Sequence, residues 1–175
     1  MAHETQQDGP VLDADAFVAA NIEWLRDFAW GGLEVRPSRR MAILTCMDSR
    51  YTAQGVLGVA LGEAHVIRNA GGRVTDDAIR SLVLSAHALG TRGCVLIHHT
   101  NCGLHGTSNE AIWGQVREAT GEDASGIDFL PFDDTAESVR EDLARLRACR
   151  LFPAGYQVLG FVYDVRTGRL EPIEG

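Results

Sequence analysis

The sequence predicts an α/β fold with a mainly parallel central sheet flanked by helices. Short apolar runs that suit buried strands alternate with stretches of helical period, which is the order expected when parallel strands are joined by helical crossovers. The chain has 175 residues, 45% of them hydrophobic, which suits one domain with a substantial core. It shows no internal repeat, low-complexity tract or domain linker.

Four apolar segments are predicted to be strands, because each is short and bounded by turn residues. They occupy 41–46, 63–69, 94–99 and 156–165. The turn at 166–168 leads into 169–173, which we expect to pair back on the last strand as a C-terminal hairpin.

Helical periodicity predicts helices between these strands. The helix after Thr75 has the clearest limits, because Thr75 is a good N-cap, two aspartates follow in the first turn and Gly90 ends the pattern. Further helices are expected over 13–30, 107–119 and 134–149, with 121–132 as an exposed loop.

The N-terminal part of the chain is expected to comprise a flexible arm over 1–12 and the first helix of a single domain that spans 13–175. That helix is apolar over so much of its surface that it needs more than one neighbour. A partner subunit is one way to supply it. The apolar positions include Phe17, Val18, Ile22, Trp24, Leu25 and Phe28.

Charge and hydropathy argue against several classes of partner. The chain has 16 basic and 24 acidic residues, a net charge of −8, and an acidic surface repels nucleic-acid phosphates. No apolar run approaches the roughly 20 residues that span a bilayer. The first ten residues lack the basic start and apolar stretch of a secretory signal. We therefore expect a cytoplasmic protein with neither a nucleic-acid nor a membrane partner.

The four cysteines divide into two kinds. Cys94 and Cys149 have apolar neighbours in the sequence and are expected to be small buried hydrophobic residues. Disulfides are rare in a reducing cytosol, where grouped cysteine and histidine more often indicate a metal or catalysis. Cys102 lies three residues after His99, and Cys46 ends a predicted strand.

These three residues are candidate zinc ligands. Cys46 ends the first strand, His99 ends the third, and Cys102 is in the following turn. Ligands of open parallel sheets bind beyond the carboxyl ends of the strands, where the strand order reverses, so the two strand ends can meet. Thiolate, imidazole and thiolate leave one position of a tetrahedral zinc open, which distinguishes a catalytic zinc from a structural one.

Asp48 and Arg50 follow Cys46 at alternate positions, so in extended chain all three side chains point the same way. The carboxylate and guanidinium can then form a paired fork. Because two thiolates cancel the charge of Zn²⁺, an acceptor beside the zinc-bound water would help, and Asp48 can be that acceptor while Arg50 holds it. The alternative is a surface ion pair, worth at most about 1 kcal/mol.

Three motifs stand out in the sequence: CMDSR at 46–50, EAHVIRNAGGRVTDDAIRSL at 63–82 and HHTNCG at 98–103. Together they resemble the β-class carbonic anhydrases, and the resemblance runs from about residue 13 to the C-terminal hairpin. The resemblance implies a parallel sheet flanked by helices in a homodimer or homotetramer, with the N-terminal helix packed on the neighbouring subunit. It also implies one Zn²⁺ per subunit on Cys46, His99 and Cys102, with Asp48 and Arg50 as the catalytic dyad.

The activity implied by the resemblance is that of a carbonate dehydratase, a zinc lyase. A zinc-bound hydroxide would attack carbon dioxide, and bicarbonate and a proton would leave. Ala70, Gly71 and Gly72 are expected to bring backbone close to the substrate pocket, with a simple tight turn as the alternative. His105 and His65 are candidate proton shuttles, with surface or packing roles as the alternative.

His98 directly precedes a ligand on a strand, so it is expected to face the other side as a core histidine. Two positions depart from the family. Asn101 stands where many close relatives have an acid, and Pro37 stands nine residues before Cys46, where plant-type members carry a substrate-holding glutamine. Some members move the counterpart of Asp48 onto zinc at low pH, and we hypothesise the same here.

Two other readings remain open. The same site could hydrolyse carbonyl sulfide or carbon disulfide, which are also linear and apolar, as some family members do. The chain could instead be a non-catalytic zinc-stabilised or sensory module, in which zinc has no exchangeable ligand and the dyad is not needed.

Overall fold

A computed structural model describes residues 12–175. This part of the chain forms two compact units, divided between Leu33 and Glu34. The predicted arm at 1–12 lies outside the described residues except for Leu12. The larger unit contains the sheet and every residue that the sequence proposes for the site.

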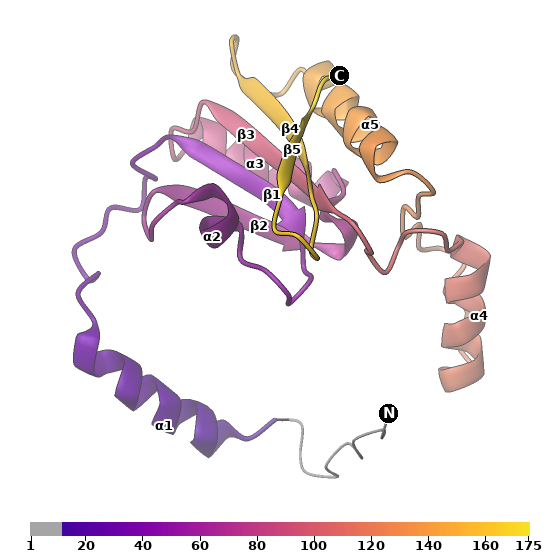
Figure 1. Ribbon diagram of the computed structural model, residues 1–175, viewed down its shortest axis with the longest axis horizontal. Helices are drawn as coiled ribbons and strands as arrows, with labels where there is room; N and C mark the ends of the chain where they lie inside the picture. Colours follow the sequence, from indigo (N-terminus) through magenta and orange to yellow (C-terminus); the bar gives the residue numbers. More distant parts are fainter. Residues whose placement is uncertain (1–11) are drawn as a thin grey trace. The chain divides into compact units, whose positions relative to one another are not determined.

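The sheet has five strands in the order β2-β1-β3-β4-β5 (Figure 1). The first four run parallel, and β5 pairs antiparallel with β4, which confirms the mainly parallel sheet and the C-terminal hairpin. The strands are β1 (Met41–Cys46), β2 (Ala64–Asn69), β3 (Gly93–His99), β4 (Gln157–Tyr163) and β5 (Leu170–Ile173).

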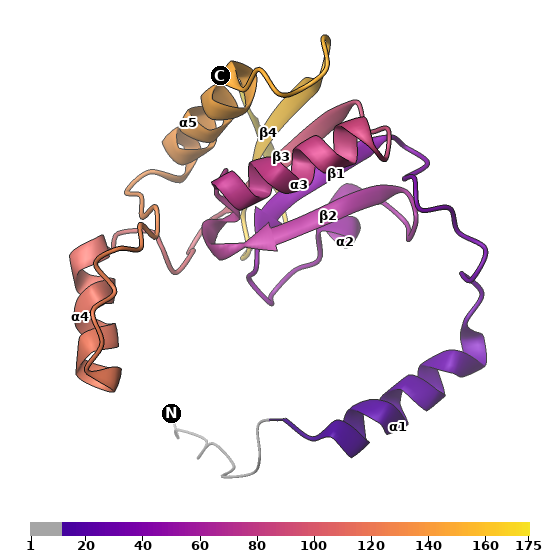
Figure 2. The ribbon, with the colours of Figure 1, turned by 180° about the vertical axis from the view of Figure 1, so that it is seen from behind.

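Two helices, α3 (Asp76–His87) and α5 (Thr135–Ala148), cover one face of the sheet, and the short α2 (Ala53–Leu57) lies on the other (Figure 2). Both long helices begin where the sequence predicts. Thr75 caps α3 and Asp134 caps α5, each through a side-chain oxygen that accepts a backbone N–H of the first turn.

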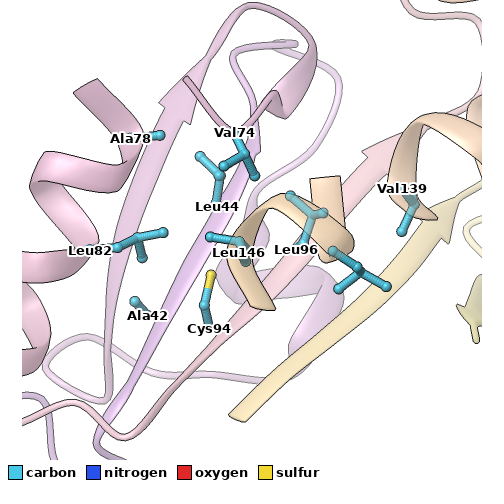
Figure 3. Packing of buried hydrophobic residues seen from close by; sticks show 10 residues of the cluster. Ala42, Leu44, Val74, Ala78, Leu82, Cys94, Leu96, Val139 and Leu146 are labelled. Atoms are coloured by element: carbon cyan, nitrogen blue, oxygen red, sulfur yellow. The ribbon is translucent and has the colours of Figure 1, made fainter. Parts of the chain in front are cut away.

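The main core lies between the sheet and these two helices (Figure 3). Leu44 of β1 and Leu96 of β3 are fully buried with Leu82 of α3, and burying each such side chain contributes about 2 kcal/mol. Gly160 lets α5 approach the sheet, because a β-carbon there would lie 2.6 Å from Val139 Cγ1. The core therefore holds the strand ends rigidly in place.

The N-terminal unit contains α1 (Ala14–Trp24), capped by Asp13 and followed by a 3₁₀ turn at Leu25–Asp27. The helix predicted over 13–30 is therefore too long. Trp30 stacks on Trp24 with ring centroids 5.1 Å apart, and Phe28 packs edge-on against Trp30. This aromatic contact requires the chain to turn back after Trp24, which a continuous helix would prevent.

α4 (Asn109–Thr120) begins after its N-cap, Ser108. The segment that follows it is the predicted loop and is largely exposed, but its end turns inward. Phe132 at its end is only 8% exposed. The indole of Trp113 donates to the carbonyl of Ile127 at 2.8 Å, and the Asn109 side chain accepts the backbone N–H of Phe129 at 2.9 Å. These bonds hold the loop along α4.

None of the helices described between residues 12 and 175 has the length and apolar character needed to cross a membrane.

Candidate metal centre

The strand order reverses between β1 and β3. The chain leaves β1 toward β2 on one side and leaves β3 toward β4 on the other, so the connections after these two adjacent strands diverge and open a crevice at their carboxyl ends. Cys46 is the last residue of β1 and His99 the last of β3. The structure brings their ligand atoms and that of Cys102 within 4.8 Å of one another.

The donor set fits a zinc ion. His99 Nδ1 lies 2.9 Å from the carbonyl of Thr100, to which it can donate, and Nε2 is buried without a hydrogen-bond partner. Such a bond directs the lone pair of Nε2 toward a metal. Ligands of one tetrahedral zinc are about 3.5 to 3.8 Å apart, given Zn–S and Zn–N lengths near 2.3 and 2.0 Å, so small adjustments suffice.

The two thiols are electrostatically linked. A hydrogen bond from Cys102 lowers the pKa of the Cys46 thiol to about 4, although burial opposes this change. The same interaction raises the pKa of Cys102, and burial adds to it. Cys46 is therefore the more readily ionised of the two thiols, and the thiolate is the form that binds metals.

Asp48 and Arg50 form the predicted fork beside this cluster. Arg50 Nε donates to Asp48 Oδ1 at 2.9 Å, and Nη2 donates to Oδ2 at 2.7 Å. The guanidinium lowers the pKa of the Asp48 carboxyl to about 2. Asp48 Oδ2 lies 3.8 Å from His99 Nε2, which places the carboxylate at the edge of the metal cluster.

The route to this fork differs from the prediction. Extended chain does not align the two side chains, because residues 49–50 form a turn and the Arg50 backbone N–H donates to Asp48 Oδ1 at 2.9 Å. The aspartate side chain thus closes a local turn as well as the ion pair.

Two residues, Arg68 and Asn101, hold the segment from Cys46 to Tyr51 in place. No function was assigned to either of them from the sequence. Arg68 donates to the carbonyls of Cys46 at 2.9 Å, Tyr51 at 3.2 Å, and Asp48. Its place next to Asn69, which pairs with Cys46 across the sheet, is the sequence signal that could have found it. Asn101 accepts hydrogen bonds from Arg50, and no local pattern indicates that contact.

Gly71 and Gly72 bring backbone into close contact with the ends of β1 and β3 and with Leu104. A β-carbon on Gly72 would lie 2.8 Å from Cys46 N and 3.0 Å from Ile97 O, and one on Gly71 would lie 2.8 Å from Leu104 Cδ1. Both glycines have positive φ, 73° and 72°, which disfavours any side chain. Close approach therefore explains this turn better than turn geometry alone.

An apolar wall adjoins the ligands. Leu104 and Phe132 are buried in one cluster with Cys46 and Cys102, and half-buried Ala70 packs against it. Phe132 comes from the segment after α4, which the sequence places in an exposed loop, so no pattern indicates its role. These apolar side chains therefore shield one side of the candidate metal cluster from water.

The other histidines lie in different surroundings. His98 is fully buried on the face of the sheet that α5 covers, opposite to His99, with Nδ1 2.8 Å from Ser138 Oγ, as expected of a core histidine. His105 is exposed and its ring lies 5.9 Å from that of Phe132. His65 pairs with Ala42, four residues before Cys46 and so about 13 Å along the strand; the structure does not bring it to the metal cluster.

A cavity of about 890 Å³ lies at the amino ends of the strands and contains none of the proposed site residues. Pro37 lines it. Since Pro37 precedes the first residue of β1 and Cys46 is the last, it is at the wrong end of the strand to hold a substrate on the metal.

Known proteins are similar to this chain in sequence and in fold. The family model described as "Carbonic anhydrase" matches residues 41–123. β-Carbonic anhydrase 1 of Mycobacterium tuberculosis is 38% identical over 161 residues, which cover 91% of this chain and 96% of that protein. A carbon disulfide hydrolase of Saccharolobus solfataricus is 44% identical over 178 residues, covering 88% of this chain and 87% of that protein.

Among solved structures, a carbonic anhydrase from Streptococcus mutans superposes with a TM-score of 0.87. It is 46% identical, and the match covers 91% of this chain and 96% of the other. The strand order, the Cys-His-Cys cluster and these similarities agree: the chain belongs to the β-carbonic anhydrase family, whose members are zinc enzymes.

Proposed function

We propose that the protein catalyses the reversible hydration of carbon dioxide to bicarbonate and a proton, with one Zn²⁺ per subunit held by Cys46, His99 and Cys102. The observation that carries this proposal is the buried cluster of three soft ligands with the Asp48–Arg50 fork at its edge, 3.8 Å from His99 Nε2. The resemblance to named carbonic anhydrases supports it.

A Zn²⁺ ion bound by these residues would act as a Lewis acid and make water nucleophilic near neutral pH. The protein supplies orientation. Because the pKa of Asp48 is about 2, its carboxylate is ionised in the physiological range and can only accept a hydrogen bond. A nucleophilic oxygen beside it must therefore direct its proton to Asp48 and a lone pair elsewhere, while the Arg50 fork keeps the carboxylate in place.

The substrate side of the site is proposed to be the apolar wall of Leu104 and Phe132 together with the backbone of Ala70, Gly71 and Gly72. Carbon dioxide is linear, small and apolar, so it gains from a dry surface and needs few polar contacts. His105 is the better of the two shuttle candidates, because its exposed ring packs against Phe132 of this wall. Cys46, His99 and Cys102 are all buried.

Stopped-flow measurement of carbon dioxide hydration by zinc-loaded protein tests the proposal. Wild type should exceed the buffer rate by orders of magnitude, and Asp48→Ala should lose most of that rate. A wild type no faster than buffer would contradict the enzymatic proposal and favour the non-catalytic zinc module. Equal, fast rates for wild type and Asp48→Ala would contradict the role of the dyad.

A second candidate activity is hydrolysis of carbonyl sulfide or carbon disulfide. The observation that favours it is the similarity to several carbon disulfide hydrolases, one at 44% identity. Hydrogen sulfide release from each sulfur substrate, measured beside carbon dioxide hydration at matched concentrations, separates the two. A larger kcat/KM for a sulfur substrate would reassign the main activity.

We propose further that residues 13–175 act as one domain in a cytoplasmic homodimer or homotetramer, with α1 packed on a partner subunit. The helix exposes large apolar side chains, with Phe17 and Val18 each 60% exposed, and such a face is normally buried against a neighbouring element. Sedimentation velocity should show an oligomer that Val18→Glu dissociates, whereas Ala16→Glu, on the opposite side of the same helix, should not. A monomeric wild type would contradict this arrangement.

A further inference from the structure

The metal-bearing turn also holds the catalytic arginine. Asn101, between the ligands His99 and Cys102, accepts a hydrogen bond from Arg50 Nη1 on its side-chain oxygen at 2.8 Å. Its backbone carbonyl accepts a second from Nη2 at 2.9 Å. Arg50 thus contacts Asp48 along one edge of the guanidinium and Asn101 along the other.

The consequence concerns Asp48. Its Oδ2 lies 3.8 Å from His99 Nε2, close to the roughly 3.5 Å that separates two ligands of one zinc. A small swing would bring the carboxylate into the fourth metal position, where it would compete with any external ligand. The fork to Arg50 opposes that swing only as firmly as Arg50 is itself held, and its side chain is 43% exposed.

We propose that Asn101 is a positioning residue that anchors Arg50 and thereby keeps Asp48 out of the fourth metal position. The inference rests on the proposed metal site and deepens the proposed function. Asn101 does not touch the reacting atoms; it acts through Arg50. Its neutral amide accepts a hydrogen bond from the guanidinium without adding a further negative charge beside the two cysteine ligands.

The backbone at Asn101 offers a clean substitution. Its φ is +55°, a conformation that glycine adopts without strain. Asn101→Gly therefore removes the side-chain acceptor and leaves the backbone carbonyl to accept Nη2. Asn101→Asp restores an acceptor oxygen of the same shape, and since carbon dioxide is uncharged, the added charge does not repel the substrate.

The decisive measurement is thiocyanate binding to the cobalt-loaded protein, followed by the visible absorption of the metal, in a double-mutant cycle. The four proteins are wild type, Asn101→Gly, Arg50→Ala and the double variant. Asn101→Gly should weaken thiocyanate binding roughly three- to tenfold, the effect of one partly exposed hydrogen bond to a charged group. In the Arg50→Ala background it should have almost no further effect.

Additive effects would overturn the proposal, because Asn101 would then act through the ligand turn and not through Arg50. Loss of bound cobalt from Asn101→Gly would overturn it for the same reason. The Asn101→Asp protein should recover most of the kcat/KM that Asn101→Gly loses, and failure to recover any would also count against the anchor.

The cycle also separates this inference from the proposed activity. A wild type that hydrates no carbon dioxide contradicts the proposed function, yet the four thiocyanate affinities still decide the role of Asn101. An active wild type with an additive cycle contradicts the anchor alone.

Discussion

The backbone of Gly72 lies against the backbone of Cys46, so closely that a β-carbon on Gly72 would be 2.8 Å from the Cys46 nitrogen. The contact joins the turn after β2 to the end of β1, where the candidate metal ligand Cys46 lies. The atoms it would meet belong to backbone in the middle of the sheet, which cannot move aside.

Gly72→Ala should therefore be strongly destabilising. A methyl group there combines a steric clash with positive φ, and we expect a loss of about 3 kcal/mol in the free energy of unfolding. Gly90→Ala is the matched control, since Gly90 also has positive φ, 77°, but no atom within 4 Å of the added carbon. Urea unfolding should show a loss of only about 1 kcal/mol there, and equal losses at both positions would argue against the clash.

The metal ligands predict a specific pattern of zinc content. Cys46→Ala and Cys102→Ala should each abolish stoichiometric zinc binding, because two remaining ligands hold zinc poorly. Cys149→Ala should retain it. Elemental analysis after dialysis against a weak chelator measures the content, and zinc should raise the Tm of wild type and Cys149→Ala alone. Full zinc content in Cys46→Ala would refute the ligand assignment.

Arg50→Lys tests geometry at constant charge. Lysine keeps the positive charge but cannot make two parallel hydrogen bonds to Asp48, so we expect kcat to fall roughly tenfold or more. Zinc content should be unchanged. The variant Arg80→Lys, at an exposed ion pair to Asp77 outside the site, is the control. If Arg50→Lys keeps full activity, charge alone suffices and the fork is unnecessary.

Tyr51 predicts a loss of stability at alkaline pH. Its ring is buried and its hydroxyl is 2.8 Å from Thr45 Oγ1, and burial raises its pKa to about 12. Below about pH 10 the tyrosine is protonated in both states. Between about pH 10 and 12 the unfolded chain releases this proton first, so stability falls by up to about 1.4 kcal/mol per pH unit.

Tyr51→Phe removes that proton. Urea unfolding between about pH 9 and 11 should show a shallower fall for the variant, although its stability at neutral pH should be about 1 kcal/mol lower because one hydrogen bond is lost. Parallel pH profiles for the two proteins would show that Tyr51 does not titrate as its burial predicts.

Local patterns in the sequence determined the elements and the ligands. Apolar runs predicted strands such as 41–46, which the structure confirms residue for residue, and caps such as Thr75 placed the start of α3. These signals succeed because propensity, capping and burial act over a few neighbouring residues. Cys46, His99 and Cys102 were identifiable because two strand ends of a parallel sheet must meet at one edge.

Only the tertiary structure decided which distant groups support that cluster. Asn101 reaches Arg50 across 51 positions of the chain, Phe132 is buried at the end of a largely exposed loop, and His65 lies at the end of its strand that is far from the candidate metal cluster. No period or spacing in the sequence predicts these contacts, because each depends on how separate elements pack. The sequence by itself thus indicated which residue types could form the site, whereas long-range packing determined which other residues hold them in place.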